Sequence, residues 1–460
     1  MKILLAYPKM RYVTGDPPLG IAYVASYVKQ RGFDVRILDT TFNHSWNFVE
    51  RTIRKEKPDI IGIYSATTMI RDALRTADIG KANGVPLVVL GGPHPSVRPE
   101  ETLAHRSVDA VVIGEGEYAF HKIAENFGKN GEIKDFAKIP NLYFKLNGKI
   151  RKNEKRHFIK NLDSIPPPSR ELLDMENYIK HWFQMDVVAP GLKGTSIFTS
   201  RCCPYECAFC QPTVKKMFGN TMRRRSQENI IEELKYLKKK YRINAFQIYD
   251  DIFLIDNNYV SEFCERMIEE DLNLMWTCHA RANIPLDDKL IEKMRAAGLR
   301  SVGIGIESGS QRILNMYNKR INLQQAKTII KSFKKHGIMV RGFFIMGAPT
   351  ETVREMKKTI SFAVNSRIDE GVFSILCPFP GTHIYEKAKE MGWEISEDWS
   401  PDCYYSRSGF RSGTLPEKIV KRYQQIAMIL FYFHPFRARY LLNSLLQPRR
   451  SFAKIKTYFI

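Results

Sequence analysis

Four of the chain's eight cysteines fall within eleven residues, in the stretch SRCCPYECAFC at positions 200–210. Three of them keep the spacing Cys203-x3-Cys207-x2-Cys210, and thiolates so close together on one loop can bind a metal ion or an iron–sulfur cluster. A structural zinc site normally closes with a second cysteine pair, but the other cysteines outside this stretch are scattered, at Cys264, Cys278, Cys377 and Cys403. A 4Fe-4S cluster on three thiolates would leave one iron open to an outside ligand. The spacing therefore favours a cluster that activates a substrate.

The composition indicates what kind of protein carries this loop. With 44% hydrophobic and 26% charged residues the chain can bury cores and still cover a surface, and 460 residues predict two or three domains. The N-terminal stretch MKILLAYPKMRYVTGDPP does not read as a secretory signal, because Pro8 and Pro17 interrupt its short apolar run. We expect a cytoplasmic protein, in which clustered cysteines are metal ligands or redox thiols rather than disulfides.

The elements that would position the loop begin with a doubly wound domain. Residues 1–135 alternate between short apolar runs and amphipathic stretches, which is typical of a Rossmann-like parallel sheet with helices on both faces. Ligands of such sheets bind at the carboxyl ends of the strands, which here are mostly small and polar. We expect a cofactor-binding domain, then a proline-containing linker over 136–190. The predicted strands are 2–7, 34–39, 59–65, 86–92 and 109–114.

A second alternating series occupies residues 191–400. Each gap between its apolar runs is long enough for a helix, and six β/α units predict a partial (β/α)6 barrel with its chemistry at the carboxyl ends of the strands. The cysteine loop directly follows the first of these strands, which is where an active-site loop is expected. The predicted strands are 194–200, 245–251, 274–280, 301–308, 339–347 and 371–379.

This loop, with Phe209 just before its third cysteine, resembles the cluster-binding loop of the radical S-adenosylmethionine (SAM) superfamily. The resemblance implies that Cys203, Cys207 and Cys210 hold a 4Fe-4S cluster whose open iron is chelated by SAM. In that family one electron from the cluster cleaves SAM to methionine and a 5′-deoxyadenosyl radical, which abstracts hydrogen from the substrate. It also implies an electron donor such as ferredoxin or flavodoxin.

Phrases at the other strand ends look like segments of the radical SAM branch that carries an N-terminal cobalamin-binding domain: YDDIFLID, HARANI, GIGIESGSQRIL, GFFIMGAPTET and PFPGTHIYEKAKEMG. Each position that this resemblance suggests for SAM also has a structural alternative. An aspartate could cap a turn, an arginine and a glutamate could form an ion pair, and a glycine could relieve packing. The SAM candidates are Asp250, Asp251, Arg281, Glu307, Gly347 and Pro349.

Residues 1 to about 130 resemble the cobalamin-binding domain of the same branch. The wider cobalamin pattern DxHxxG supplies a histidine to cobalt, but the matching loop here reads MRYVTGDPPLG. Members without the histidine bind cobalamin with no protein nitrogen on cobalt, so the resemblance still implies a cobalamin site; the alternative is a domain that binds nothing. We favour a structural role for His94 over one as a substitute ligand. The cobalamin candidates are Ser65, Thr67, Gly91, Gly92, Gly114, Glu115 and Gly116.

The C-terminal part, residues 401–460, predicts a basic helical extension. The chain has a net charge of +22, and residues 404–460 carry eleven lysines and arginines against Glu417 alone. Such a surface attracts nucleic acid, anionic lipid or acidic partners. The apolar run 426–433 is too short to span a bilayer. We favour a helix that caps the open side of the barrel, with a peripheral membrane contact as the alternative.

Three functions are compatible with these patterns. The first is a cobalamin-dependent radical SAM enzyme that methylates an unactivated carbon of a small-molecule, lipid or tetrapyrrole-like substrate. The second is a radical SAM oxidase, cyclase or carbon-coupling enzyme that does not use cobalamin. The third is a tRNA-modifying or nucleic-acid-binding protein, which is disfavoured because the basic residues are not interleaved with aromatic ones as stacking platforms require. We expect the first.

Overall fold

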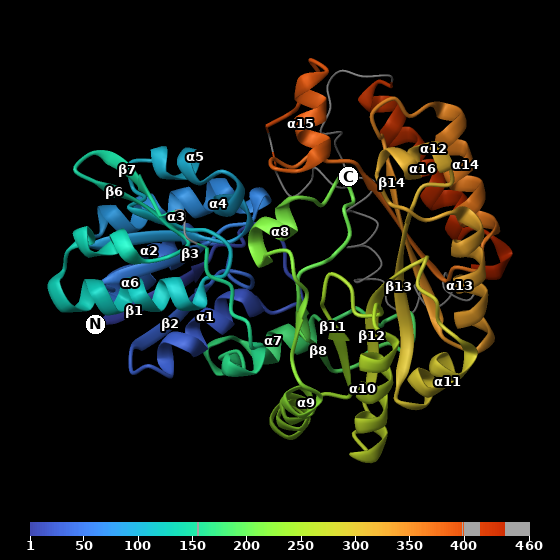
Figure 1. The fold of residues 1–460 in the computed structure, drawn as a ribbon, viewed down its shortest axis with the longest axis horizontal. Helices are drawn as coiled ribbons and strands as arrows, with labels where there is room; N and C mark the ends of the chain where they lie inside the picture. Colours follow the sequence, from blue (N-terminus) through green and yellow to red (C-terminus); the bar gives the residue numbers. More distant parts are fainter. Residues whose placement is uncertain (154–155, 398, 400–414, 438–460) are drawn as a thin grey trace. The chain divides into compact units, whose positions relative to one another are not determined.

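The computed structural model describes the chain except for residues 154–155, 398, 400–414 and 438–460 (Figure 1). The chain folds into two compact units. The first is formed by Met1–Trp182, Ser200–Pro204 and Pro212–Asn229, and the second by Phe183–Thr199, Tyr205–Gln211 and Ile230–Ile460. The cysteine loop contributes to both, because Cys203 belongs to the first unit and Cys207 and Cys210 to the second.

The first unit is built on a seven-stranded sheet in the order β2-β1-β3-β4-β5-β6-β7. Its first five strands are parallel, which confirms the prediction, and their 2-1-3-4-5 order is that of a flavodoxin-like doubly wound sheet. Two antiparallel strands extend it at one edge. The strands are β1 (Lys2–Tyr7), β2 (Asp34–Asp39), β3 (Ile60–Tyr64), β4 (Leu87–Gly91), β5 (Ala110–Val112), β6 (Leu142–Leu146) and β7 (Lys149–Lys152).

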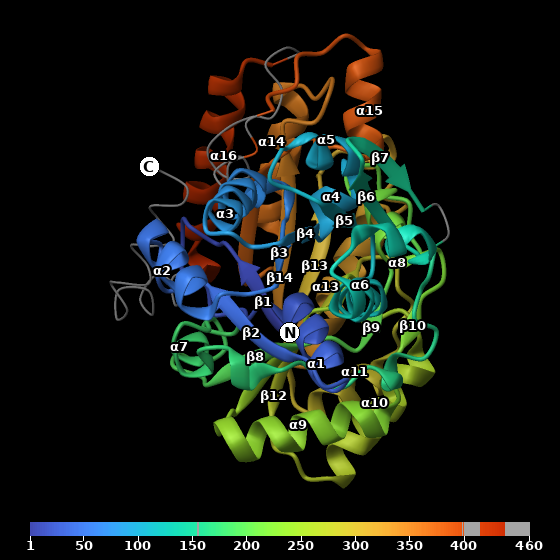
Figure 2. The same cartoon turned by 90° about the vertical axis from the view of Figure 1, so that its left-hand side faces the viewer.

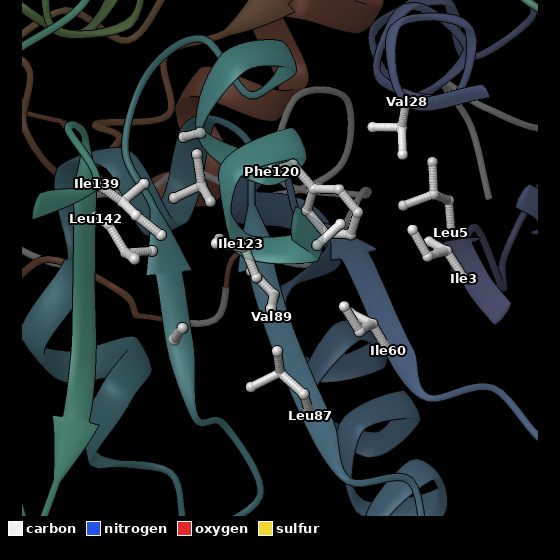
Figure 3. Packing of buried hydrophobic residues seen from close by; sticks show 14 of the residues in the cluster. Ile3, Leu5, Val28, Ile60, Leu87, Val89, Phe120, Ile123, Ile139 and Leu142 are labelled. Atoms are coloured by element: carbon white, nitrogen blue, oxygen red, sulfur yellow. The ribbon is translucent and has the colours of Figure 1, made fainter. Parts of the chain in front are cut away.

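Alternate residues of the parallel strands enter two hydrophobic cores, because successive side chains of a strand point to opposite faces. Ile3 and Leu5 of β1 lie in the core under α1 and α6, shown in Figure 3. Leu4 and Ala6 lie in the core under α2 and α3. The helices therefore cover both faces of the sheet (Figure 2). They are α1 (Leu19–Lys29), α2 (Trp46–Glu56), α3 (Ile70–Ala82), α4 (Pro93–Val97), α5 (Pro99–Ala104) and α6 (Glu117–Asn130).

The segment 136–190 differs from the expected linker. It contains the hairpin β6–β7 and the helix α7 (Met175–Lys180), and it lies in the first unit as far as Trp182. The hairpin turns at Asn147 and Gly148, whose φ angles of 52° and 74° suit the type I′ turn that an Asn-Gly pair favours. The expected linker rested on the three prolines at 166–168, which lie further along the chain and point to an extended path.

The second unit is built on a six-stranded parallel sheet in the order β15-β14-β13-β12-β11-β8. Sequential strands are neighbours throughout, as the prediction of a partial (β/α)6 barrel requires. The strands are β8 (Gly194–Ile197), β11 (Ala245–Ile248), β12 (Met275–Arg281), β13 (Leu299–Glu307), β14 (Met339–Met346) and β15 (Glu370–Ile375). The short strands β9 (Ser200–Arg201) and β10 (Arg223–Arg224) pair with each other and belong to the first unit.

Helices connect the strands of the second sheet and cover one of its faces. Trp276 on β12 is buried against Phe263 of α10, and the capping boxes Asn322–Gln325 and Thr352–Glu355 begin α13 and α14. The helices that follow β10 are α9 (Gln227–Tyr241), α10 (Asn257–Glu269), α11 (Asp288–Ala296), α12 (Gln311–Met316), α13 (Leu323–Lys335), α14 (Val353–Asn365), α15 (His383–Glu390) and α16 (Glu417–Tyr432).

The helix α16 of the C-terminal extension packs along the edge strand β15. Phe431 lies against Phe373, and the side-chain amide of Gln424 donates a hydrogen bond to the carbonyl of Phe373 at 2.8 Å. Within the described residues, no helix combines the length and the apolar character that a membrane span needs.

Arg437, which follows α16, is completely buried. Its guanidinium donates hydrogen bonds of 2.8–3.3 Å to five backbone carbonyls, at Ala363, Val364, Ser366, Ile368 and Phe431. Two of these carbonyls lie in the last turn of α14, where no intrahelical partner is available. Arg437 therefore joins the extension to the barrel.

The substitution Arg437→Met should lower the free energy of unfolding by about 3 kcal/mol, because it leaves several buried carbonyls without a donor. The matched control Arg422→Met removes an exposed arginine of α16 and should change it by less than about 0.5 kcal/mol. Urea unfolding followed by circular dichroism measures both. Equal stability of the two variants would contradict this role of Arg437.

Candidate active site

In the second unit the cysteine loop follows β8 and is held by backbone contacts. The Ala208 amide donates to the carbonyl of Tyr317 at 2.8 Å, and the Ala208 carbonyl accepts from the Ile384 amide at 3.0 Å. Phe209 packs edge-on against the ring of Tyr317, with centroids 5.2 Å apart. The amide of Cys210 donates to the carbonyl of Cys207 at 3.0 Å, so the two cysteines share one turn.

A buried arginine contacts one of these thiols. Arg281, at the end of β12, has its Nη1 atom 3.1 Å from the Sγ of Cys207, and its guanidinium stacks 3.7 Å above the ring of Tyr205. It also donates to the carbonyl of Lys319. The guanidinium thus places a positive charge beside the sulfur of Cys207. The predicted alternative, an ion pair of Arg281 with Glu307, is not formed.

Glu307 instead pairs with Lys319, a residue that sequence reasoning missed. The two charged atoms are 2.6 Å apart, and both side chains are 7% exposed. Glu307 has a φ of 68° and follows a register shift in the ladder between β13 and β14. A Cβ on Gly305 would lie 2.6 Å from the Glu307 carboxylate, so any other residue there would force the ion pair to shift.

Charged groups from several strand ends surround the thiol of Cys210. Desolvation raises its pKa, and the negative charges of Cys207, Glu307 and Asp251 raise it further, while Lys319 opposes them. The residue as a whole is exposed, but the surrounding protein desolvates its thiol. The structure thus brings Asp251 and Glu307, two predicted SAM candidates, into electrostatic range of Cys210.

The two neighbouring aspartates after β11 have different surroundings. Asp250 is buried and accepts hydrogen bonds from the amide and the hydroxyl of Thr199, at 2.7 and 2.5 Å, which ties the end of β11 to the end of β8. Asp251 is exposed at its surface, yet desolvation by the protein around it and the charge of Asp250 raise its pKa to about 6. Asp251 has the carboxylate that is still open to a ligand.

The end of β14 is organised by Glu351, a second residue that sequence reasoning missed. Its carboxylate accepts from the amides of Gly347 and Ala348 at 2.7 and 3.0 Å. Burial raises the pKa of Glu351 to about 7. Gly347 has a φ of 81°, which glycine adopts at no steric cost, and Pro349 beside it is half-buried.

Most of the cobalamin candidates of the first unit lie at the carboxyl ends of β3, β4 and β5. Ser65 is buried, and its carbonyl accepts from the His94 amide at 3.1 Å. Gly92 has a φ of 107°, and a Cβ there would lie 2.8 Å from that same carbonyl, so the backbone needs glycine. Gly91 is half-buried, and Thr67 begins a short 3₁₀ turn.

His94 is only 1% exposed, and burial lowers its pKa to about 4. The nearby positive charge of Arg98 acts in the same direction. A ring so deeply buried within the first unit fits the structural role that we favoured for it.

The loop after β5 is bound to protein groups. The amide of Gly114 donates to the Ser96 hydroxyl at 2.9 Å, and the buried Glu115 pairs with Arg201 and Arg223 at 3.0 and 2.8 Å. The next residue, Gly116, precedes α6. The sequence suggested that Glu115 contacts cobalamin. In the structure it instead pairs with Arg201 on β9 and Arg223 on β10.

Two family models match the chain, a B12 binding domain over residues 13–124 and the Radical SAM superfamily over residues 197–363. The Uncharacterized methyltransferase PH0819 of Pyrococcus horikoshii is 36% identical to it over 448 residues, which cover 95% of this chain and 93% of that protein. The chain belongs to the radical SAM enzymes that carry a B12-binding domain.

Two further similarities agree with this family. The anaerobic magnesium-protoporphyrin IX monomethyl ester cyclase of Rubrivivax gelatinosus is 28% identical over 470 residues, covering 97% of this chain and 82% of that protein. The radical SAM methyltransferase TsrM from Kitasatospora setae, solved with cobalamin and a 4Fe-4S cluster bound, has a TM-score of 0.70 at 16% identity, covering 85% of this chain and 78% of that chain. This last similarity concerns the fold.

A radical SAM enzyme of this kind uses a 4Fe-4S cluster, SAM and cobalamin. The donor set fits the cluster, because none of the three cysteines Cys203, Cys207 and Cys210 forms a disulfide. Among the residues that the structure describes, no three His, Cys, Asp or Glu side chains converge on a single metal ion. A cluster does not require that convergence, since each thiolate binds a different iron.

Cys202, the fourth cysteine of the stretch, is oriented differently. It is 1% exposed, it has an unusual φ of 81°, and its thiol donates to the carbonyl of Gly219 at 3.1 Å. This contact binds the Cys202 thiol to a backbone carbonyl within the first unit.

The substitution Cys202→Ser should keep the cluster, because a hydroxyl can also donate to the Gly219 carbonyl. A serine at Cys203, Cys207 or Cys210 should abolish it, because an iron loses its thiolate. Iron and sulfide analysis after anaerobic reconstitution, together with the visible absorption spectrum, measures the occupancy. Full occupancy in any of the last three variants would refute the assignment of that cysteine.

Proposed function

We propose that the protein is a cobalamin-dependent radical SAM methyltransferase that methylates an unactivated carbon of a small-molecule, lipid or tetrapyrrole-like substrate. The observation that carries the proposal is that a B12-binding domain and a cysteine loop occur in one chain, which is 36% identical over nearly its whole length to a protein named as a methyltransferase. When bound, the cluster supplies the electron that cleaves SAM, and cobalamin supplies the methyl group.

The residues around the cysteine loop have separable roles in this proposal. Cys203, Cys207 and Cys210 hold the cluster, and Arg281 keeps a positive charge beside Cys207. Asp251 offers its exposed carboxylate to SAM. The SAM contacts first suggested for Asp250, Glu307 and Gly347 become positioning roles, since protein groups engage each of them.

Methylation of an unactivated carbon has a defined stoichiometry. The substrate C–H bond would break, its hydrogen would complete 5′-deoxyadenosine, and the carbon would form its new bond to the methyl group of cobalamin. A second SAM, together with a second electron from the reductant, would then restore that methyl group and leave S-adenosylhomocysteine. The protein, reconstituted anaerobically with iron, sulfide and hydroxocobalamin, should therefore form both products from SAM under a strong reductant. The variant Cys207→Ser should lose 5′-deoxyadenosine, and Cys202→Ser should retain it. Chromatography of the quenched reaction measures both compounds.

The outcome also separates the competing functions. A cluster and 5′-deoxyadenosine without bound cobalamin would refute methyl transfer and leave an oxidase, cyclase or carbon-coupling enzyme, a candidate that the similarity to a cyclase supports. Formation of neither product by a protein with a full cluster would contradict both. Retention on an RNA column at physiological salt would instead favour a nucleic-acid substrate.

We assign the supply of electrons to a small acidic carrier such as ferredoxin or flavodoxin. The net charge of +22 would attract a negatively charged carrier and accelerate the encounter.

A peripheral membrane contact is the second part of the proposal, and an exposed apolar patch supports it. The patch, which we call the α16 patch, consists of large side chains that are 43–73% exposed in the described part of the chain: Ile429, Leu430, Phe433 and Phe436. After the buried Arg437, the sequence contains five arginines and lysines and no acidic residue. Aromatic and aliphatic side chains followed in sequence by such a basic stretch suit an anionic lipid surface, and lipid contact would suit a lipid substrate.

The double substitution Phe433→Ser/Phe436→Ser should weaken binding to anionic vesicles several-fold, because it removes the two aromatic side chains of the α16 patch. Sedimentation with vesicles that contain phosphatidylserine, an anionic lipid that attracts basic segments, measures the bound fraction. Vesicles of phosphatidylcholine alone serve as the control. If the unsubstituted protein sediments equally with both vesicle types, or with neither, the membrane contact is refuted.

A further inference from the structure

Two arginines stand directly opposite each other in the first unit, close to the first cluster cysteine. Arg201 on β9 pairs with Arg223 on β10 in an antiparallel ladder. Their side chains are only 13% and 10% exposed. Like charges opposite each other across a ladder repel, and burial increases the cost. The pairing therefore requires compensating negative charge.

Two glutamates from the loop after β5 provide that charge. Glu115 lies between the arginines, with its Oε1 atom 3.0 Å from Arg201 and 2.8 Å from Arg223. Glu117, the first residue of α6, has its Oε1 atom 2.5 Å from the other terminal nitrogen of Arg201. The side chains of Glu115 and Glu117 are 2% and 4% exposed. The four groups form a buried cluster with no net charge.

This charge cluster lies just before the cysteines along the chain. Arg201 precedes Cys203 by two residues, and the residue between them, Cys202, is fixed by its contact with Gly219. Arg223 is held further by the carbonyls of Ile159 and Phe218 at 2.6 Å. The pairing with β10 and the contact of Cys202 thus restrain the backbone that leads into Cys203.

We propose that Glu115 and Glu117 are positioning residues for the 4Fe-4S cluster: they hold Arg201, and with it the backbone before Cys203, and they cancel the charge of the two arginines. The proposal does not depend on methyl transfer, because it needs only the cluster that the family uses. It assigns to Glu115 a role other than cobalamin binding, and it adds Glu117, which sequence reasoning missed.

The charge compensation has a consequence for the redox chemistry of the cluster. Reduction adds one negative charge to the cluster, so an uncompensated arginine nearby would stabilise the reduced state. The midpoint potential would then become more positive and the cluster a weaker reductant towards SAM. Surroundings without net charge therefore keep the reduced cluster a strong reductant. A firmly held backbone keeps the Cys203 thiolate in place on the cluster.

The test uses the full-length protein, reconstituted anaerobically with iron and sulfide. The variant Glu117→Gln retains the shape of the side chain but removes its charge, so we expect a midpoint potential more positive than that of the unsubstituted protein and a loss of iron on desalting. The control Glu125→Gln makes the same change on α6 at a surface pair with Lys122 and Lys129, and should alter neither. Redox titration monitored by electron paramagnetic resonance measures the potential.

A second variant separates charge from anchoring. Arg201→Lys keeps the positive charge but loses the two-nitrogen contact with the glutamates, so we expect loss of iron with an unchanged potential. Circular dichroism confirms that each variant folds. If Glu117→Gln fails to fold, the iron content of Arg201→Lys becomes the test, and full retention of iron in that variant overturns the proposal. The proposal is also overturned if Glu117→Gln folds and has the same iron content and midpoint potential as the unsubstituted protein.

Discussion

Parallel strands place all their carboxyl ends at one edge of a sheet, and the candidate site of the second unit depends on that constraint. The cysteine loop follows β8, and Asp250, Arg281 and Glu307 lie at the ends of the next three strands. The ladder itself brings these residues together although they come from distant parts of the sequence. Each is then fixed by a specific partner, which is Thr199 for Asp250, Cys207 for Arg281 and Lys319 for Glu307.

Charge compensation recurs in both units. In the first unit Glu115 and Glu117 balance Arg201 and Arg223, and in the second Glu307 balances Lys319. Buried ions are costly unless they are paired, so these contacts restrict the backbone to one arrangement. A loop that holds three thiolates needs such restraint, because their spacing must match a rigid inorganic cluster.

Much of the fold could be predicted because its signals are local. Alternating apolar runs located the eleven parallel strands that the described residues form, and cysteine spacing indicated the cluster. The partners of the site residues could not be predicted in the same way, since Glu117 and Arg201 are 84 residues apart and meet only in the folded chain. Lys319 is twelve residues from Glu307, yet nothing in its neighbours marks it as an ion-pair partner. The hairpin at Asn147–Gly148 is different, because its turn signal is local, and the prediction of a linker did not take it into account.

The central claim is that three thiolates hold a cluster with one iron open to SAM. Electron–nuclear double resonance of the reduced cluster, with SAM labelled by ¹⁷O in its carboxylate and ¹⁵N in its amino group, tests it most directly. We predict hyperfine couplings from both nuclei in the unsubstituted protein and in Cys202→Ser. A reduced cluster that shows neither coupling at saturating SAM would contradict the claim.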